Sequence, residues 1–234
     1  MPIVRLPREI AFPDPRLADD EVVAVGGDLN PKRVLAAYSV GIFPWPHEGM
    51  PLLWFSPDPR FVLPLDEIQV VRSLRQVIRK RKFELRLDSD FAGVMAGCAG
   101  VKRKRQKGTW ITPEMVACYT KLHVAGFAHS AEAWIDGELV GGLYGVSLGG
   151  AFCGESMFAR VDDASKVAFV TLVEQLRRWG FDFVDAQTHS EHMARFGALE
   201  MPRGEFLDAL EKTLAKPTRK GPWQLDADLA RGTA

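Results

Sequence analysis

The sequence is poor in cysteine and has no long apolar segment. Its 234 residues include three cysteines, Cys98, Cys118 and Cys153, and none of them forms a CxxC pair. This excludes a cysteine zinc cluster and a disulfide framework, so we expect reduced thiols. No apolar run reaches about 18 residues, so no transmembrane helix is expected. The N-terminus, MPIVRLPREIAF, has no apolar signal-peptide core, and we therefore expect a cytoplasmic protein.

Motifs of several common enzyme classes are also missing. There is no GxSxG nucleophile elbow, and the glycines of GGLYGVSLGG match neither a Walker loop nor a dinucleotide fingerprint. His189 and His192 are three residues apart, so they do not form the HExxH zinc motif. Cys153 lies within a predicted strand, where nothing suggests a lowered pKa, and we interpret it as a packing residue. We expect no metal and no cofactor.

The net charge of zero conceals a strongly basic block. Residues 72–107 contain twelve Lys or Arg and three Asp or Glu, a net charge of +9, so the remainder carries −9. This asymmetry indicates a polyanionic partner such as a nucleic acid. The alternative is a solvated helix face followed by a lysine-rich loop.

The chain divides by its pattern near residue 63. Prolines crowd residues 44–64 and argue against a regular helix or a central strand there, so residues 1–63 are expected to form a small, irregular N-terminal domain. Its one regular helix begins at the Asn30-Pro31 capping pair and ends at Gly41. Residues 64–234 form the main domain.

Helical and strand patterns alternate in the main domain. An amphipathic helix is predicted over 67–82, with Val71, Leu74 and Ile78 on one face and a basic stripe on another. Further helices are expected near 91–98, 112–126, 163–179, 191–196 and 204–214. Between them, HSAEAWI, ELVGGLYGVSL and AFCGESMF form a β-meander, and FDFVDAQ forms a fourth strand. The tail from Lys216 is expected to be loose. The fold class is α/β (α+β), with a mixed, mostly antiparallel sheet flanked by helices.

Three polar residues, Glu155, Asp185 and Gln187, lie on these predicted strands. In GAFCGESMFA, strict alternation places Cys153, Glu155 and Met157 on one face. In FDFVDAQ, it places Phe183, Asp185 and Gln187 together. Since ligands in α/β sheets bind where strands end or splay, these side chains predict a site. The alternatives are a Glu155 that pairs with Arg160 or reaches solvent, and a fourth strand that simply ends in solvent.

The sequence resembles the bacterial leucyl/phenylalanyl-tRNA–protein transferases from about Ile10 to Arg203. The resemblance is carried by GIFPW, WFSPDPR, GTWIT, AHSAEAW, ELVGGLYGV, FCGESMF, ASK and DAQTHSEHMARFGA, in that order. It implies transfer of leucine, phenylalanine or sometimes methionine from aminoacyl-tRNA to proteins with an N-terminal Arg or Lys, which marks them for degradation. It also implies a main domain like the GNAT acyltransferases. Those enzymes hold acetyl-CoA with a glycine-rich loop, whereas this chain has ARVDDASK at that place.

The resemblance implies roles for particular residues. Gln187 would position the attacking amine, with Asp185 polarising it or accepting the proton, while Glu155 would bind the acceptor's α-ammonium or its basic side chain. A donor pocket is implied at Leu143, Phe152, Met157, Phe169 and Leu172. Trp45 and Trp110 would stack on the terminal adenosine, with core packing as their alternative. The tRNA phosphates would meet Arg72, Arg75, Arg79, Lys82, Lys102, Arg103, Lys104 and Arg105. The other interpretations kept open are a GNAT-type N-acetyltransferase and a non-catalytic RNA-binding module; a monomer is expected.

Overall fold

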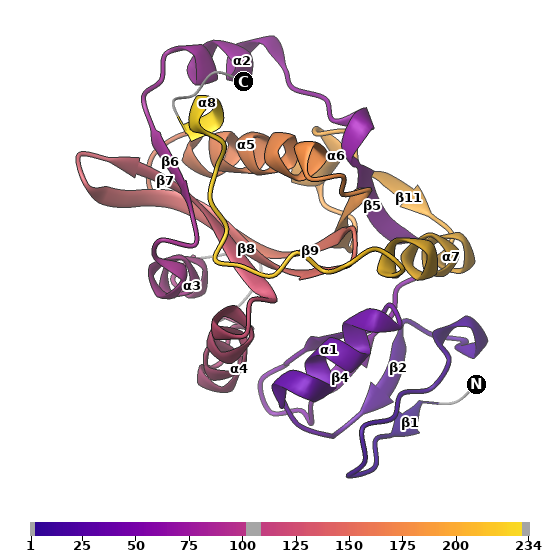
Figure 1. Cartoon of the computed structure of the whole chain (residues 1–234). Coiled ribbons are helices and arrows are strands. Elements are labelled where there is room, and N and C mark those ends of the chain that lie inside the picture. Colours follow the sequence, from indigo (N-terminus) through magenta and orange to yellow (C-terminus); the bar gives the residue numbers. More distant parts are fainter. Residues whose placement is uncertain (1–2, 102–108, 231–234) are drawn as a thin grey trace.

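Two β-sheets organise the protein, as a computed structural model that describes residues 3–101 and 109–230 shows (Figure 1). The small sheet has the order β1-β2-β4-β3 and the large sheet the order β11-β5-β10-β9-β8-β7-β6. The small-sheet strands are β1 (Val4–Arg5), β2 (Val22–Val25), β3 (Phe43–Trp45) and β4 (Leu53–Phe55). Those of the large sheet are β5 (Arg60–Pro64), β6 (Glu84–Leu87), β7 (Ala128–Ile135), β8 (Glu138–Leu148), β9 (Ala151–Ala159), β10 (Phe183–Gln187) and β11 (Leu199–Met201).

Helices cover both faces of the large sheet. One face carries α2 (Arg72–Arg79), α5 (Ala164–Arg178), α6 (Glu191–Ala194) and α8 (Ala227–Ala230); the other carries α3 (Phe91–Ala99), α4 (Pro113–Val124) and α7 (Arg203–Leu214) (Figure 1). Helix α1 (Pro31–Ser39) packs on the small sheet, and two short 3₁₀ turns lie at Pro15–Leu17 and Leu65–Glu67. The large sheet is antiparallel except between β9 and β10. The predicted fold class is therefore confirmed.

Local sequence signals place several helix ends correctly. The side chains of Asn30 and Thr112 cap α1 and α4, each with proline at the first helical position. The meander, α5 and β10 follow in the predicted order. The helix predicted over 67–82 is shorter, because α2 spans only Arg72–Arg79. Leu74 and Ile78 are buried as expected, but Val71 is exposed.

The interpretation of the proline-rich segment was wrong in one respect. Strand β5 lies between β10 and β11 in the interior of the large sheet. Its only proline, Pro64, is the last residue of the strand, where a lost backbone donor does little harm to the ladder. The chain changes sheets between Phe55 and Arg60, slightly before the boundary predicted at 63/64. The division into two domains stays a prediction.

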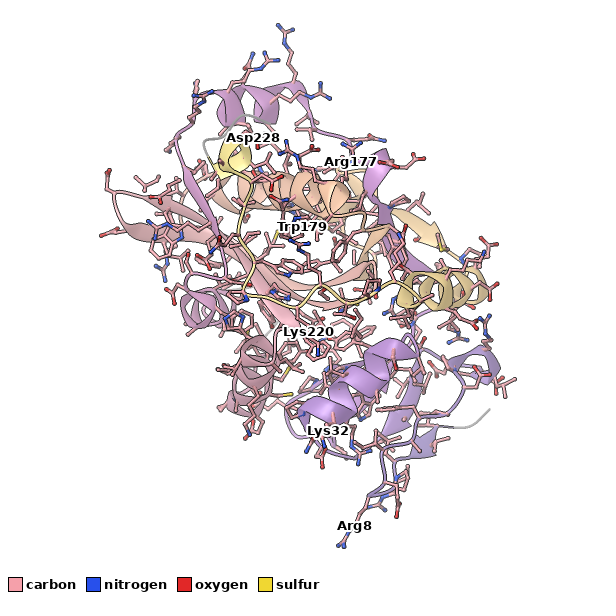
Figure 2. All side chains as sticks on the ribbon, viewed as in Figure 1. Arg8, Lys32, Arg177, Trp179, Lys220 and Asp228 are labelled. Carbon is pink, nitrogen blue, oxygen red and sulfur yellow. The ribbon has the colours of Figure 1, made fainter. Side chains whose placement is uncertain are left out.

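The C-terminal tail is packed rather than loose. Trp223 is only 2% exposed and stacks on the His129 ring, 3.6 Å between centroids. Its backbone N–H donates to Asp88 at 2.7 Å. Beyond it, Arg178 of α5 donates two hydrogen bonds of 2.8 Å to Asp228 of α8. Figure 2 labels Asp228 on α8. A single buried aromatic ring thus anchors a segment whose composition is that of a loop.

Candidate active site

A cavity opens where β9 and β10 part. The two strands pair from Ala151–Phe183 to Cys153–Asp185, and residues 154–159 of β9 continue without pairing to β10. The cavity between the separated strands has a volume of about 640 Å³. Its walls come from β3, β8, β9, α5, the end of β10 and α6, so both domains of the prediction contribute. This volume suits a ligand of drug size or an amino-acid side chain with part of a nucleoside.

Six of the seven predicted pocket residues line this cavity. They are Trp45, Trp110, Leu143, Phe152, Met157 and Phe169. The exception is Leu172, which is buried in the core between α5 and the sheet and is not part of the wall. Leu172 lies three residues after Phe169 on the same helix, so both face the same side. Helical periodicity therefore could not tell that Phe169 lines the cavity and that Leu172 lies in the core.

A β-bulge places Glu155 at the cavity. Tyr144 of β8 lies opposite Ser156, and the next residue, Gly145, lies opposite Gly154, so Glu155 is the extra residue on β9. A side chain on Gly145 would lie 2.3 Å from the carbonyl oxygen of Cys153, so only glycine permits this approach. The bulge reverses the alternation, and the prediction that Cys153, Glu155 and Met157 share a face was wrong. Cys153 packs in the same core cluster as Tyr38 and Tyr119, which hold Glu155, whereas Met157 packs against the other cluster, on the α5 side of the sheet. Glu155 and Met157 both line the cavity.

The Glu155 carboxylate is held by three neutral donors. Its Oε1 accepts from the Tyr38 hydroxyl at 2.5 Å and from the Gln187 side-chain amide at 2.7 Å. Its Oε2 accepts from the Tyr119 hydroxyl at 3.2 Å, and the two tyrosine hydroxyls are 2.7 Å apart. Burial raises the pKa of Glu155 to about 7, against the hydrogen bonds, which lower it. The alternative pairing with Arg160 is not what the structure shows.

A second bulge turns Gln187 toward the cavity. Asp185 lies opposite Val62 and Gln187 opposite Phe61, with Ala186 as the extra residue. Gln187 also has φ +65°, in the left-handed region that side chains rarely adopt. Phe183 and Asp185 share the face toward α7, but Gln187 leaves it and joins the cavity wall. The prediction that all three share one face therefore fails at Gln187.

Asp185 lies behind the cavity wall rather than in it. It is 1% exposed, and both of its oxygens bind Arg60, at 2.8 Å to Nε and 2.7 Å to Nη2. Arg60 is itself 1% exposed, lies between the rings of Phe43 and Phe206, and donates to the carbonyl of Gly41. Asp185 Oδ1 also accepts the backbone N–H of Gln187 at 2.9 Å. Asp185 thus reaches the cavity through the backbone of Gln187.

Sequence reasoning missed several residues at this site. Tyr38 and Tyr119 come from α1 and α4, and nothing in their helical spacing distinguishes them from core tyrosines. Arg60 stands in the recognised WFSPDPR segment, but its partner is 125 residues away. His192 also lines the cavity; its Nε2 is buried without a hydrogen-bond partner among the described residues, and burial lowers its pKa.

The basic stripe lies on a different element from the cavity. Arg72, Arg75, Arg79 and Lys82 are all exposed, on and just beyond α2, and none is among the lining residues. Lys102, Arg103, Lys104 and Arg105 lie outside the described residues. Helix α2 packs on α5, whose N-terminal turn forms one cavity wall.

The described residues provide neither a reactive thiol nor a cluster of metal ligands at the cavity. Burial raises the pKa of the Cys153 thiol well above its ordinary value, which agrees with a packing role. Among residues 3–101 and 109–230, no three His, Cys, Asp or Glu side chains gather as a metal site would require. The helices described here include none long and apolar enough to span a membrane. An apolar cavity with a carboxylate and a carboxamide on one wall is suited to bind and orient a ligand that carries a polar group.

Comparisons with known proteins identify the family. Residues 62–211 match the family described as leucyl/phenylalanyl-tRNA protein transferase, and residues 27–58 match its N-terminal domain. The protein named leucyl/phenylalanyl-tRNA–protein transferase in Anaeromyxobacter sp. (strain Fw109-5) is 56% identical to this chain over 228 residues, which cover 97% of each chain. In Myxococcus xanthus (strain DK1622) the identity is 58% over 213 residues, covering 91% of each. The chain belongs to the leucyl/phenylalanyl-tRNA–protein transferase family, and it is a transferase.

A solved structure of L-PGS from Bacillus licheniformis also matches. The likeness covers 74% of this chain and 57% of that one, with a TM-score of 0.39 and 12% identity. It is too weak to support a conclusion.

Proposed function

We propose that the protein transfers leucine or phenylalanine, with methionine as a further donor, from aminoacyl-tRNA to the N-terminal Arg or Lys of acceptor proteins. The product would be marked for degradation by its new bulky N-terminus. The observation that carries the proposal is the cavity itself: apolar walls face the Glu155–Gln187 pair, which is anchored from outside by Asp185. The predicted site residues therefore act as one constellation in this proposal.

The donor side chain would occupy the apolar part of the cavity. Leu143, Phe152, Met157 and Phe169 supply aliphatic and aromatic surface of intermediate size. Met157 is unbranched and flexible, so it can adapt to leucine or phenylalanine. Leu172 would support Phe169 from behind rather than contact the donor.

The terminal adenosine would lie at the two tryptophans. Trp45 and Trp110 line the same cavity, and both are only partly buried. The ring of Trp45 already stacks with His47 and packs edge-on against Phe55, which fixes its plane. Stacking of one base on such a ring contributes roughly 1–3 kcal/mol without sequence preference. The exposed α2 stripe would hold acceptor-stem phosphates, which position a tRNA without selecting its sequence.

The acceptor amine would arrive between Glu155 and Gln187. The Glu155 carboxylate attracts an α-ammonium by a charge-assisted hydrogen bond. Gln187 is rigid, because its backbone N–H is fixed by Asp185 and its amide by Glu155. An aminoacyl ester is already activated, so orientation of the amine at its carbonyl carbon supplies much of the catalysis, roughly 7–11 kcal/mol in favourable cases.

The N-terminus of α5 favours this donor over acetyl-CoA. In place of a glycine-rich phosphate loop it carries Asp163, whose carboxylate pairs with Lys166 at 2.7 Å. A carboxylate at that position repels a pyrophosphate. We further propose that the protein acts as a monomer in the cytoplasm, where aminoacyl-tRNA is found.

The test is transfer of radiolabel from Leu-tRNA or Phe-tRNA to a peptide that starts with Arg. The matched control peptide differs only in a neutral first residue. Label on the Arg peptide, and little on the control, supports the proposal. Labelling only from acetyl-CoA would instead indicate an N-acetyltransferase, and tRNA binding without transfer would indicate a non-catalytic RNA-binding module.

A further inference from the structure

The two carboxylates of the site are held in opposite ways. Asp185 is enclosed by a guanidinium that binds both of its oxygens. Glu155 is enclosed by two phenols and a carboxamide, all of them neutral. A cation favours the ionised form of a carboxyl group, whereas burial without a cation favours the protonated form. Where one site separates two carboxyl groups in this way, the separation indicates which of them exchanges a proton.

A count of protons around Glu155 agrees with this difference. Tyr38, Tyr119 and the carboxyl group make three oxygen–oxygen contacts, at 2.5, 2.7 and 3.2 Å. Two hydroxyl protons can occupy only two of these contacts when Glu155 is ionised. When the Tyr119 hydroxyl turns to donate to Tyr38, a proton on Oε2 occupies the 3.2 Å contact that Tyr119 leaves. The three contacts among Tyr38, Tyr119 and Glu155 are therefore all occupied only when Glu155 is protonated, and Oε2 is the oxygen that can carry the added proton.

Among residues 3–101 and 109–230, no cation faces Glu155 closely enough to compensate a negative charge there. The titratable groups that face it are Tyr38 on α1, Tyr119 on α4, and Cys153 and Asp185 on neighbouring strands. Across the cavity, Lys166 on α5 is already paired with Asp163, and His192 on α6 has a lowered pKa. The pKa of about 7 at Glu155 follows from burial first. An ammonium that enters the cavity would be the unpaired cation that Glu155 lacks.

We propose that Glu155, rather than Asp185, takes the proton from the acceptor's α-ammonium, with Tyr38 and Tyr119 as the hydroxyls that hold it for this task. This rests on the proposed function. The ammonium gives one proton to Oε2, and the freed nitrogen lone pair forms a bond to the ester carbon. The bond from that carbon to the ribose oxygen breaks; the oxygen keeps the electron pair and takes the second amine proton. The products are an amide, a tRNA hydroxyl and a protonated Glu155, which returns its proton to solvent.

The pKa of Glu155 is close to that of the acceptor's α-ammonium, which makes the proton transfer between them efficient. An α-ammonium has a pKa of about 7.7–8.0. A base with a pKa near 7 can take its proton at small cost, and general base catalysis is most effective near the operating pH. Asp185 and Arg60 are then positioning residues, because they reach the reactants only through the backbone of Gln187.

The decisive experiment compares two acceptors in single-turnover transfer from Phe-tRNA. One is a peptide with N-terminal Arg, and the other is the same peptide with an aminooxy group in place of the α-amine. The aminooxy nitrogen is neutral at neutral pH, so it has no proton to lose before attack. We expect Glu155→Gln to slow transfer to the ordinary peptide roughly 10²–10⁴-fold. Transfer to the aminooxy peptide should fall far less.

Asp185→Asn is the matched control. It also removes one negative charge from the site, but it should slow both acceptors by the same factor, because positioning matters to either nucleophile. Equal losses for both acceptors in Glu155→Gln would overturn the proton role and leave Glu155 a binding residue. If the wild-type enzyme transfers no amino acid to the ordinary peptide, the proposed function itself fails, and this is seen before any variant is used.

A second variant tests the proposal without removing the carboxyl group. Tyr38→Phe deletes a hydrogen bond that lowers the pKa of Glu155. The acidic limb of the rate–pH profile should therefore move to higher pH, by up to about one unit, while the peptide amine is unchanged. No movement of the limb in a folded Tyr38→Phe variant would contradict the proposal. Thermal melting by circular dichroism checks the fold of each variant.

Discussion

Arg60 binds both carboxylate oxygens of Asp185 in the core, and the backbone N–H of Gln187 binds the same carboxylate from the cavity side. Each partner of this ion pair is 1% exposed. The pair joins β5 to β10 and, through the Gly41 carbonyl and the Phe43 ring, joins the large sheet to the chain that forms the small one. It therefore supports the fold and the active-site wall at once.

We expect Arg60→Met to destabilise the protein by about 3–5 kcal/mol, because it leaves a buried carboxylate without its cation. Arg60→Met combined with Asp185→Leu should recover much of that stability, since no charge then remains buried. Urea unfolding followed by circular dichroism measures both. The double variant should still transfer poorly, because the acceptor for the Gln187 N–H is gone. A double variant with full activity would make the pair purely structural.

Met157→Ala should impair leucine transfer more than phenylalanine transfer. The substitution enlarges the cavity, and the smaller donor side chain loses the greater share of its contacts. We expect a difference of about 1–3 kcal/mol in discrimination, measured as the ratio of kcat/KM for the two aminoacyl-tRNAs. Leu172→Ala is the comparison, because Leu172 is core rather than wall; it should lower stability without changing the ratio. An unchanged ratio in Met157→Ala would remove that residue from the pocket.

Replacement of Arg72, Arg75 and Arg79 together by Ala should weaken tRNA binding and flatten its dependence on salt. Phosphate contacts release counterions, so each lost contact reduces the slope of log affinity against log salt by about 0.9 for a duplex. The matched control removes three exposed cations elsewhere, Arg8, Lys32 and Lys121. Arg8 and Lys32 lie at the opposite end of the molecule from α2 (Figure 2). Identical slopes for both triple variants would exclude α2 from the tRNA footprint.

Stability should fall with rising pH because of Glu155. Its pKa is raised in the folded protein to about 7 from an ordinary value of 4.5, so the folded state binds the proton more tightly than the unfolded state does. The stabilisation is present below pH 4.5 and is lost as the pH rises to about 7, by up to roughly 3 kcal/mol. Glu155→Gln keeps a neutral group and should lack this loss. Denaturant unfolding between pH 5 and pH 8 compares the two; parallel curves would contradict the assignment.

The sequence alone determined the class of the protein and most of its elements. Capping pairs such as Asn30-Pro31 and Thr112-Pro113 act within one helical turn, so their effect is visible locally. The meander follows from turn residues and alternation, which are also local. Long ordered motifs identified the family, and they contain Glu155, Asp185 and Gln187. The presence of these residues was therefore predictable.

Only the tertiary structure decided which way these residues point and what they contact. The bulges at Glu155 and Ala186 each shift the alternation by one residue, and a shift of one reverses every later side chain on the strand. Such bulges arise from pairing with other strands, so strict alternation misplaced Met157 and Gln187. The burial of Trp223 against His129 likewise depends on a partner 94 residues away. The opposite electrostatic environments of Asp185 and Glu155 have the same origin: Arg60, Tyr38 and Tyr119 lie far from both in sequence, and only folding brings a cation to one carboxylate and neutral hydroxyls to the other.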